Sequence, residues 1–146
     1  MIPLSARLGL PSFTSPVRVS CLLFLCWFLF VFRLGERDLT SSHEARAAQN
    51  ADTILKDGNW GLPRLVNQRV ELQKPPLYYW LVAIIARFQG EVDAWAVRLP
   101  AALAAMACVL FLYLFGCYRN RPMAGFLAAL ILVTCMHFMW LGRVGR

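Results

Sequence analysis

The fold of this chain depends on the stretch Val70-Glu71-Leu72-Gln73-Lys74-Pro75-Pro76-Leu77-Tyr78-Tyr79-Trp80. Proline has a fixed φ and no N–H, so we expect an extended chain up to Lys74 and a helix after the prolines. A cation beside a helix N-terminus favours an anion, phosphate above all. The aromatic residues that follow prefer a membrane–water interface. The stretch predicts an anion-binding corner on a bilayer surface, and the alternative is an amphipathic surface helix with a solvated lysine.

Composition indicates a membrane protein, because 59% of the 146 residues are hydrophobic. The net charge is +7, yet all eight acidic residues lie between Glu36 and Asp93. Residues 33–96 hold eight of the fifteen basic residues, so that segment is neutral. The surplus basic residues lie beside apolar runs, which is typical of membrane topology and argues against a nucleic-acid partner. All five cysteines fall in apolar runs without a CxxC spacing, which argues against disulfides and a zinc site.

Three apolar runs predict transmembrane helices, at residues 17–34, 97–118 and 123–141. Pro100 is expected in the first turn of the second helix, where proline is tolerated. The fold class predicted is therefore an all-α membrane protein with three transmembrane helices. His137 falls in the third run, where an ionisable side chain is a functional candidate, or a neutral histidine bonded to a neighbouring helix.

Basic residues set the predicted orientation. The positive-inside rule places Arg7, Arg18, Arg119 and Arg121 on the cytoplasmic side. The remaining segments then follow as a cytoplasmic tail, a large external loop, a cytoplasmic turn and an external end, at residues 1–16, 35–96, 119–122 and 142–146. We expect the chain in the cell (inner) membrane, with the loop on the external side.

Two juxtamembrane helices are predicted in the external loop, at about residues 42–56 and 77–88. Ser41 as N-cap and Glu44 at the third position form a capping box before the first. Gly58 is expected to end that helix in the left-handed conformation. The second apolar run has about a dozen residues where a span needs about twenty, so we expect it to lie in the interface and to end at Gln89-Gly90.

The external loop also holds the candidate chemistry, in His43, Glu44, Arg46, Arg64, Arg69, Glu71 and Lys74. Cations at a rigid corner and a carboxylate at a helix start suggest a phosphorylated substrate. A carboxylate can act as a base or hold a divalent cation that neutralises phosphate. For Glu44 the capping box alone is an equally good explanation.

The order of five motifs carries a resemblance: Ser-Ser-His-Glu-Ala-Arg at 41–46, Asp-Gly-Asn-Trp at 57–60, Pro-Arg-Leu at 63–65, Lys-Pro-Pro-Leu-Tyr-Tyr-Trp at 74–80 and Ala-Val-Arg-Leu-Pro at 96–100. From about residue 16 to 146, the chain resembles the N-terminal part of membrane glycosyltransferases that use polyprenyl-phosphate sugars. These include the dolichyl-phosphate-mannose protein mannosyltransferases and the lipid A aminoarabinose transferases.

The resemblance implies part of a larger C-type glycosyltransferase fold that transfers a sugar from a polyprenyl-phosphate donor to a lipid or protein acceptor. The family has an Asp-Glu pair, the catalytic or metal-binding acidic residues, where this chain has His43-Glu44. The resemblance therefore gives the role of that acidic residue to Glu44, with His43 as helper or ligand. Glu44 is also the candidate ligand for a divalent metal ion, the one cofactor implied. Lys74 matches the lysine near the lipid phosphate, and Arg64 and Arg98 match motif arginines grouped with it.

Members of this family are several times longer and continue with further spans and a second acidic residue. We therefore expect residues 1–146 to be inactive without that continuation. Two readings outside the enzyme class remain: a non-catalytic three-span membrane scaffold or partner protein, and part of a transporter. The transporter reading is the weakest, because neither long apolar run carries a charged residue in its interior.

Overall fold

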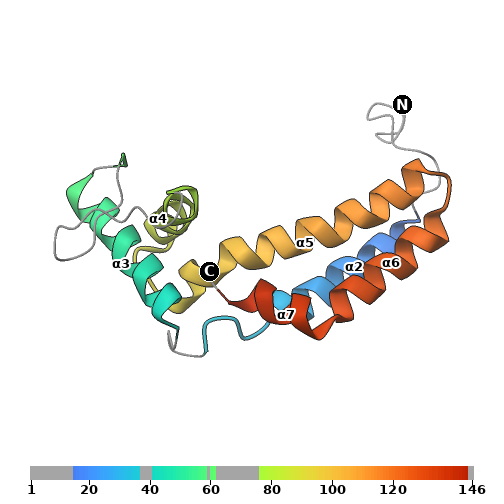
Figure 1. Cartoon of the computed structure of the whole chain (residues 1–146), viewed down its shortest axis with the longest axis horizontal. Helices are drawn as coiled ribbons and strands as arrows, with labels where there is room; N and C mark the ends of the chain where they lie inside the picture. Colours follow the sequence, from blue (N-terminus) through green and yellow to red (C-terminus); the bar gives the residue numbers. More distant parts are fainter. Residues whose placement is uncertain (1–14, 37–40, 59, 62–75, 145–146) are drawn as a thin grey trace. The chain divides into compact units, whose positions relative to one another are not determined.

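The structure is a computed structural model that describes residues 15–36, 41–58, 60–61 and 76–144, and its regular elements there are all helical (Figure 1). An all-α fold is thus confirmed for the described residues. The chain divides into two compact units, residues 1–32 with 104–139 and residues 33–103 with 140–146.

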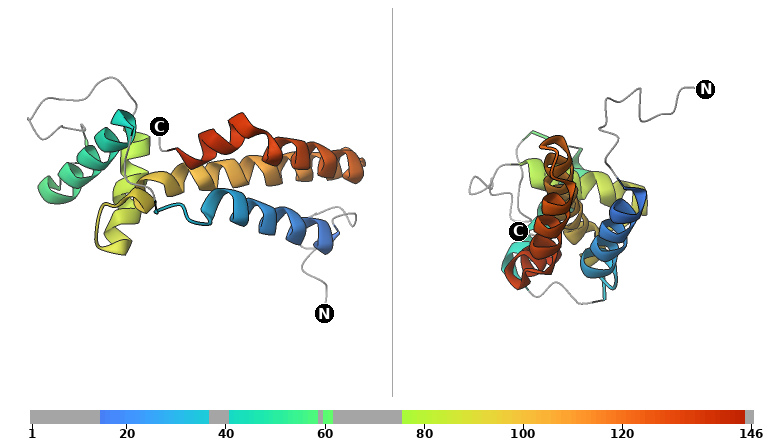
Figure 2. Two further views of the ribbon diagram at one scale, coloured as in Figure 1. Left: turned by 90° about the horizontal axis from the view of Figure 1, so that it is seen from below. Right: turned by 90° about the vertical axis from the view of Figure 1, so that its right-hand side faces the viewer.

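The first unit is built from long apolar helices. Helix α2, Pro16–Cys26, continues directly into one π-helical turn, η1, Trp27–Val31. Helix α2 packs against α6, Pro122–Thr134, and the later part of α5, Ala94–Tyr118, runs alongside both (Figures 1 and 2). Glycine allows α5 and α6 to lie this close, because a Cβ on Gly116 of α5 would lie 2.4 Å from the Cα of Gly125 on α6.

The structure supports the three predicted membrane spans only in part. Among the described helices, α5 alone is long and apolar enough to cross a membrane by itself. Helix α6 and the following α7, Met136–Arg143, meet that requirement only as a pair, and the pair is bent by 66°. The apolar helix of residues 16–31 is shorter than a span. The three-helix membrane arrangement therefore stays a prediction.

Predicted helix bounds were wrong at both ends of the first run. The expected 17–34 helix begins at Pro16, which suits a first helical position. It ends at Val31, because Phe32 has the non-helical angles φ −58° and ψ 124° and Arg33 has a positive φ of 57°.

Two expectations within the later runs were also wrong. Pro100 lies inside α5 rather than in its first turn, because the helix already begins at Ala94. The expected continuous 123–141 helix is broken at Cys135, which is extended with φ −64° and ψ 117°. Just before the break, the Thr134 hydroxyl donates to the Leu130 carbonyl at 2.7 Å, a local bond that bends helices.

The second unit has a helix at each of the two positions where the sequence predicted one in the external loop. Helix α3 covers Ser42–Asp57, and the N-cap Ser41 accepts a hydrogen bond from the His43 N–H at 3.3 Å. Helix α4 covers Leu77–Gln89. Each ends at a left-handed glycine, Gly58 with φ 65° and Gly90 with φ 95°.

The core of the second unit lies where α3 and α4 pack together (Figure 2). Small side chains bring the helices close, and larger ones fill the rest. The buried core residues are Ala47, Ala51, Ile54, Tyr79, Val82, Ala83 and Val97. Val97 comes from the first turns of α5, so this core fixes the start of α5 against α3 and α4.

Candidate active site

Glu44 and Arg98 form a buried ion pair in the second unit. The Arg98 Nε donates to Glu44 Oε1 at 2.7 Å, and Nη2 donates to Oε2 at 3.1 Å. A third donor, Nη1, reaches the Leu34 carbonyl at 3.1 Å. The two residues are only 2% and 6% exposed. The pair is bidentate and charge-assisted, which fixes the orientation of the carboxylate as well as its position.

Local structure explains why the carboxylate lies there. Glu44 is in the first turn of α3, where the positive end of the helix dipole favours an anion. Arg98 lies on the second turn of α5, and its long stem brings the guanidinium to the start of α3. The capping position thus places Glu44, and its two short contacts with Arg98 hold the carboxylate where it is buried.

Tyr78 extends this polar cluster. Its hydroxyl donates to the Val97 carbonyl at 2.6 Å, joining α4 to α5 one residue before Arg98. Burial raises the pKa of the Tyr78 phenol far above its usual value, and the negative charge of Glu44 raises it further. Tyr78 is therefore a protonated donor at neutral pH. The sequence predicted Tyr78 only as an interfacial side chain. Its hydrogen bond to Val97 was missed, because aromatic composition gives no signal for a specific carbonyl partner.

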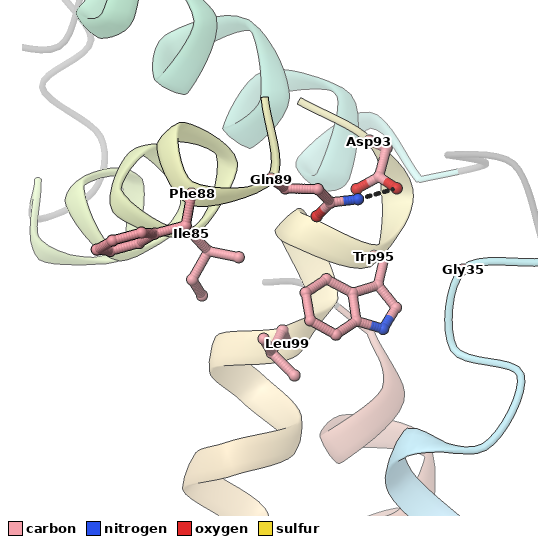
Figure 3. A pocket seen from close by; sticks show the side chains of 7 residues that line it. All are labelled: Gly35, Ile85, Phe88, Gln89, Asp93, Trp95 and Leu99. Carbon is pink, nitrogen blue, oxygen red and sulfur yellow. Dashed lines mark hydrogen bonds between the residues drawn. The ribbon is translucent and has the colours of Figure 1, made fainter. Parts of the chain in front are cut away.

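An apolar cavity of about 720 Å³ lies in the same unit, between the end of α4 and the start of α5 (Figure 3). Phe88 and Ile85 come from α4, and Trp95 and Leu99 come from α5. The polar edge is one pair, in which Gln89 Nε2 donates to Asp93 Oδ2 at 2.9 Å. The other Asp93 oxygen accepts from the Ala96 N–H at 2.7 Å and so caps α5. Sequence reasoning did not single out this cavity, because Gly35, which also lines it, stands 64 positions before Leu99 in the chain.

The predicted site residues are brought together only in part. Glu44 and Arg98 are in direct contact, and His43 is exposed beside them on α3. Lys74 and Arg64 lie outside the described residues. His137 is exposed on α7. Among the described side chains, no three of His, Cys, Asp or Glu gather in a way that could hold a metal ion.

Comparisons with a family model and with individual relatives both point to membrane sugar transferases. The family model described as dolichyl-phosphate-mannose-protein mannosyltransferase matches residues 73–145, half of the chain. No solved structure gives a significant match.

Three relatives are each named undecaprenyl phosphate-alpha-4-amino-4-deoxy-L-arabinose arabinosyl transferase, two of them with the suffix 2. The protein from Pseudomonas savastanoi pv. phaseolicola is 32% identical over 122 residues, covering 82% of this chain and 22% of the relative. The second protein, from Pseudomonas fluorescens, is 31% identical over 77% of this chain and 20% of its own. The third, from Proteus mirabilis, is 28% identical over 80% and 21%. The chain thus spans about a fifth of the length of these relatives.

Proposed function

The chain belongs to the dolichyl-phosphate-mannose-protein mannosyltransferase family, and we propose that it forms the N-terminal part of a membrane glycosyltransferase. The observation that carries this proposal is the similarity to aminoarabinose transferases over about four fifths of the chain. The donor proposed is a sugar on undecaprenyl phosphate or a related polyprenyl phosphate. The acceptor proposed is a lipid, with a protein acceptor as the second choice within the family.

Glu44 is the proposed catalytic base. In the step proposed, the acceptor hydroxyl attacks the anomeric carbon, the new carbon–oxygen bond forms and the bond to the phosphate oxygen breaks. The acceptor proton passes to the Glu44 carboxylate, and polyprenyl phosphate leaves with the bonding electrons. The geometry supports this role, since Arg98 holds both oxygens of the carboxylate in one orientation. His43 is the proposed helper, because it is the next residue on the same helix and is exposed.

The basic residues take two different proposed roles. Arg98 acts through Glu44, because its donors are directed to that carboxylate and to the Leu34 carbonyl. Lys74 and Arg64 are proposed to bind the donor phosphate. Support for Lys74 is its position two residues before Pro76, which is the N-cap of α4, so a phosphate there also meets the positive end of a helix dipole.

The apolar cavity between α4 and α5 fits the proposed class of donor. A polyprenyl chain needs a channel of apolar side chains next to the site that binds its phosphate, and Phe88, Trp95 and Leu99 offer such a surface. The proposed membrane arrangement keeps three spans, an external loop of residues 35–96 and a location in the inner membrane. Its support is the apolar α5 and the basic turn that follows it.

A divalent cation on Glu44 stays a proposal. Arg98 donates to both carboxylate oxygens, and the described side chains gather no further acidic ligand there. Each carboxylate oxygen has a second acceptor position, so the pair with Arg98 leaves room for a cation or for the acceptor proton. Transfer measured with added Mg²⁺ or Mn²⁺ and with a chelator tests the metal, and activity that the chelator leaves unchanged would contradict it.

The experiment for the proposed function is Glu44→Gln in the protein as its reading frame encodes it, including any residues after Arg146. Transfer of labelled sugar from a polyprenyl-phosphate donor is measured with matched amounts of folded protein. General-base catalysis typically contributes about 10²–10⁴-fold, so we expect a loss of that order. Glu91→Gln is the matched control, since Glu91 is an exposed acid of the same unit. Near-normal transfer by Glu44→Gln would remove Glu44 from the chemistry, and no transfer by the wild type would favour the scaffold reading.

A further inference from the structure

A second cavity, of about 480 Å³, lies in the first unit where α5 ends and α6 begins. Its lining combines two cations with an apolar surface. The cations are Arg119 and Arg121, and the apolar side chains include Leu112, Phe115, Ala124 and Ala128. Nothing in the proposed transfer reaction uses these residues.

The turn that carries the arginines is closed by its own backbone. The N–H of Arg119 donates to the Phe115 carbonyl at 3.0 Å, and the N–H of Arg121 donates to the Gly116 carbonyl at 2.9 Å. Asn120 takes a positive φ of 56° and donates to the Cys117 carbonyl at 3.0 Å. These bonds satisfy three of the carbonyls in the last turn of α5, so the guanidinium groups are not needed to cap those carbonyls.

No carboxylate of the first unit can neutralise the two arginines, because residues 1–32 and 104–139 contain no Asp or Glu. Neither arginine forms an ion pair with the described residues. Both side chains are exposed, and they flank a groove that the Gly116–Gly125 contact keeps free of bulky side chains at its base. Two cations without a counter-ion beside an apolar groove are complementary to an amphiphilic anion.

We propose that this cavity binds an anionic glycerophospholipid of the bilayer. The headgroup phosphate lies between Arg119 and Arg121 and accepts their N–H donors. One acyl chain follows the apolar side of the groove, along Phe115 and Leu112. The occupant proposed is a bilayer lipid rather than the polyprenyl-phosphate donor, because the positive-inside rule predicts a cytoplasmic turn here, whereas the proposed transfer takes place on the external face.

The experiment uses the detergent-purified chain, photo-crosslinkable phosphatidylglycerol and, in parallel, the matching phosphatidylethanolamine probe. We expect phosphatidylglycerol to label peptides of residues 112–128 more strongly than phosphatidylethanolamine does. A cation near the headgroup contributes about a fivefold change in binding, so Arg119→Gln with Arg121→Gln should weaken labelling by about 25-fold. Arg87→Gln is the matched control, because Arg87 is an exposed arginine of the second unit.

A further variant, Ala124→Trp, fills the groove and leaves both charges in place. We expect it also to reduce labelling, whereas general attraction of anions to a basic turn predicts no change. Four results would overturn the proposal: equal labelling by both probes, unchanged labelling in the double arginine variant, unchanged labelling in Ala124→Trp, or displacement of phosphatidylglycerol by equimolar undecaprenyl phosphate. The assay needs no sugar transfer, so its outcome does not depend on whether the proposed glycosyltransferase function holds.

Discussion

Replacing Arg98 by methionine tests the buried pair most directly. Arg98→Met keeps most of the apolar stem and removes the guanidinium. That group donates to Glu44 at 2.7 and 3.1 Å and to the Leu34 carbonyl at 3.1 Å. The Glu44 carboxylate, 2% exposed, is then left buried without its cation. Breaking a buried pair in this way costs about 3–5 kcal/mol in the free energy of unfolding.

The complementary changes refine that magnitude. Glu44→Gln keeps one carbonyl oxygen for the guanidinium, so we expect a cost of about 1–3 kcal/mol. The double variant Glu44→Gln with Arg98→Met leaves no buried charge, so it should cost less than the sum of the two single changes. A coupling free energy of about 1–3 kcal/mol is the expected signature of direct contact.

The assay is equilibrium unfolding of the chain in mixed micelles, followed by far-UV circular dichroism as the denaturing detergent is increased. Lys56→Met is the control, since Lys56 forms an exposed pair with Asp52 at 2.6 Å on the same helix, α3. Exposed pairs at this spacing contribute about 0.3–0.5 kcal/mol. If Arg98→Met is no more destabilising than Lys56→Met, or if the double variant is additive, the reasoning about a buried pair is refuted.

Three further predictions concern the donor site, the topology and Tyr78. Lys74→Ala should lower the use of the polyprenyl-phosphate donor about ten- to hundredfold, because it loses a contact of about 1.5–3 kcal/mol. Lys74→Arg should retain part of that use, since the charge remains. Equal donor dependence in the wild type and both variants would exclude Lys74 from the donor site. With native cysteines removed, an impermeant thiol reagent should label a cysteine at Asn59 but not at Asn120 in intact cells, and the reverse would overturn the orientation. Tyr78→Phe loses the hydrogen bond to the Val97 carbonyl and should cost about 1 kcal/mol in unfolding. The folded protein holds the pKa of Tyr78 above its unfolded value of about 10. The wild type should therefore lose stability relative to Tyr78→Phe as the pH rises above that value. Parallel stability profiles against pH for the two proteins would contradict this.

The ends of α3 and α4 were predictable from the sequence because their signals are local. Ser41 before α3 and the glycines after α3 and α4 act on backbone groups within a few residues, so neighbouring sequence is enough to identify them. The break at Cys135 had no such signal. No proline or glycine stands there, and the sequence could not show that the Thr134 hydroxyl would compete for the carbonyls of α6.

The candidate site was predictable as a set of residues but not as an arrangement. The resemblance named Glu44 and Arg98 separately, one as an acid and the other as a phosphate candidate. Their contact joins residues 54 positions apart on two helices, and neither hydrophobic periodicity nor motif order specifies which side chains of two helices meet. The close contact of Gly116 with Gly125 was unpredictable for the same reason. Taken alone, each glycine indicates only a weak tendency to form a helix.

The contacts of Glu44 also decide which substitution can separate its possible roles. An alanine would remove the proposed base, the buried partner of Arg98 and the first-turn anion at once, so a loss of transfer would not identify the cause. Glutamine keeps the side-chain volume, remains acceptable at the third position of a capping box and still offers Arg98 an oxygen acceptor. It lacks the negative charge and the basicity that proton transfer needs. A Glu44→Gln protein that stays folded but no longer transfers sugar would therefore separate the chemistry from the structural role, because the ion pair and the cap account for stability alone.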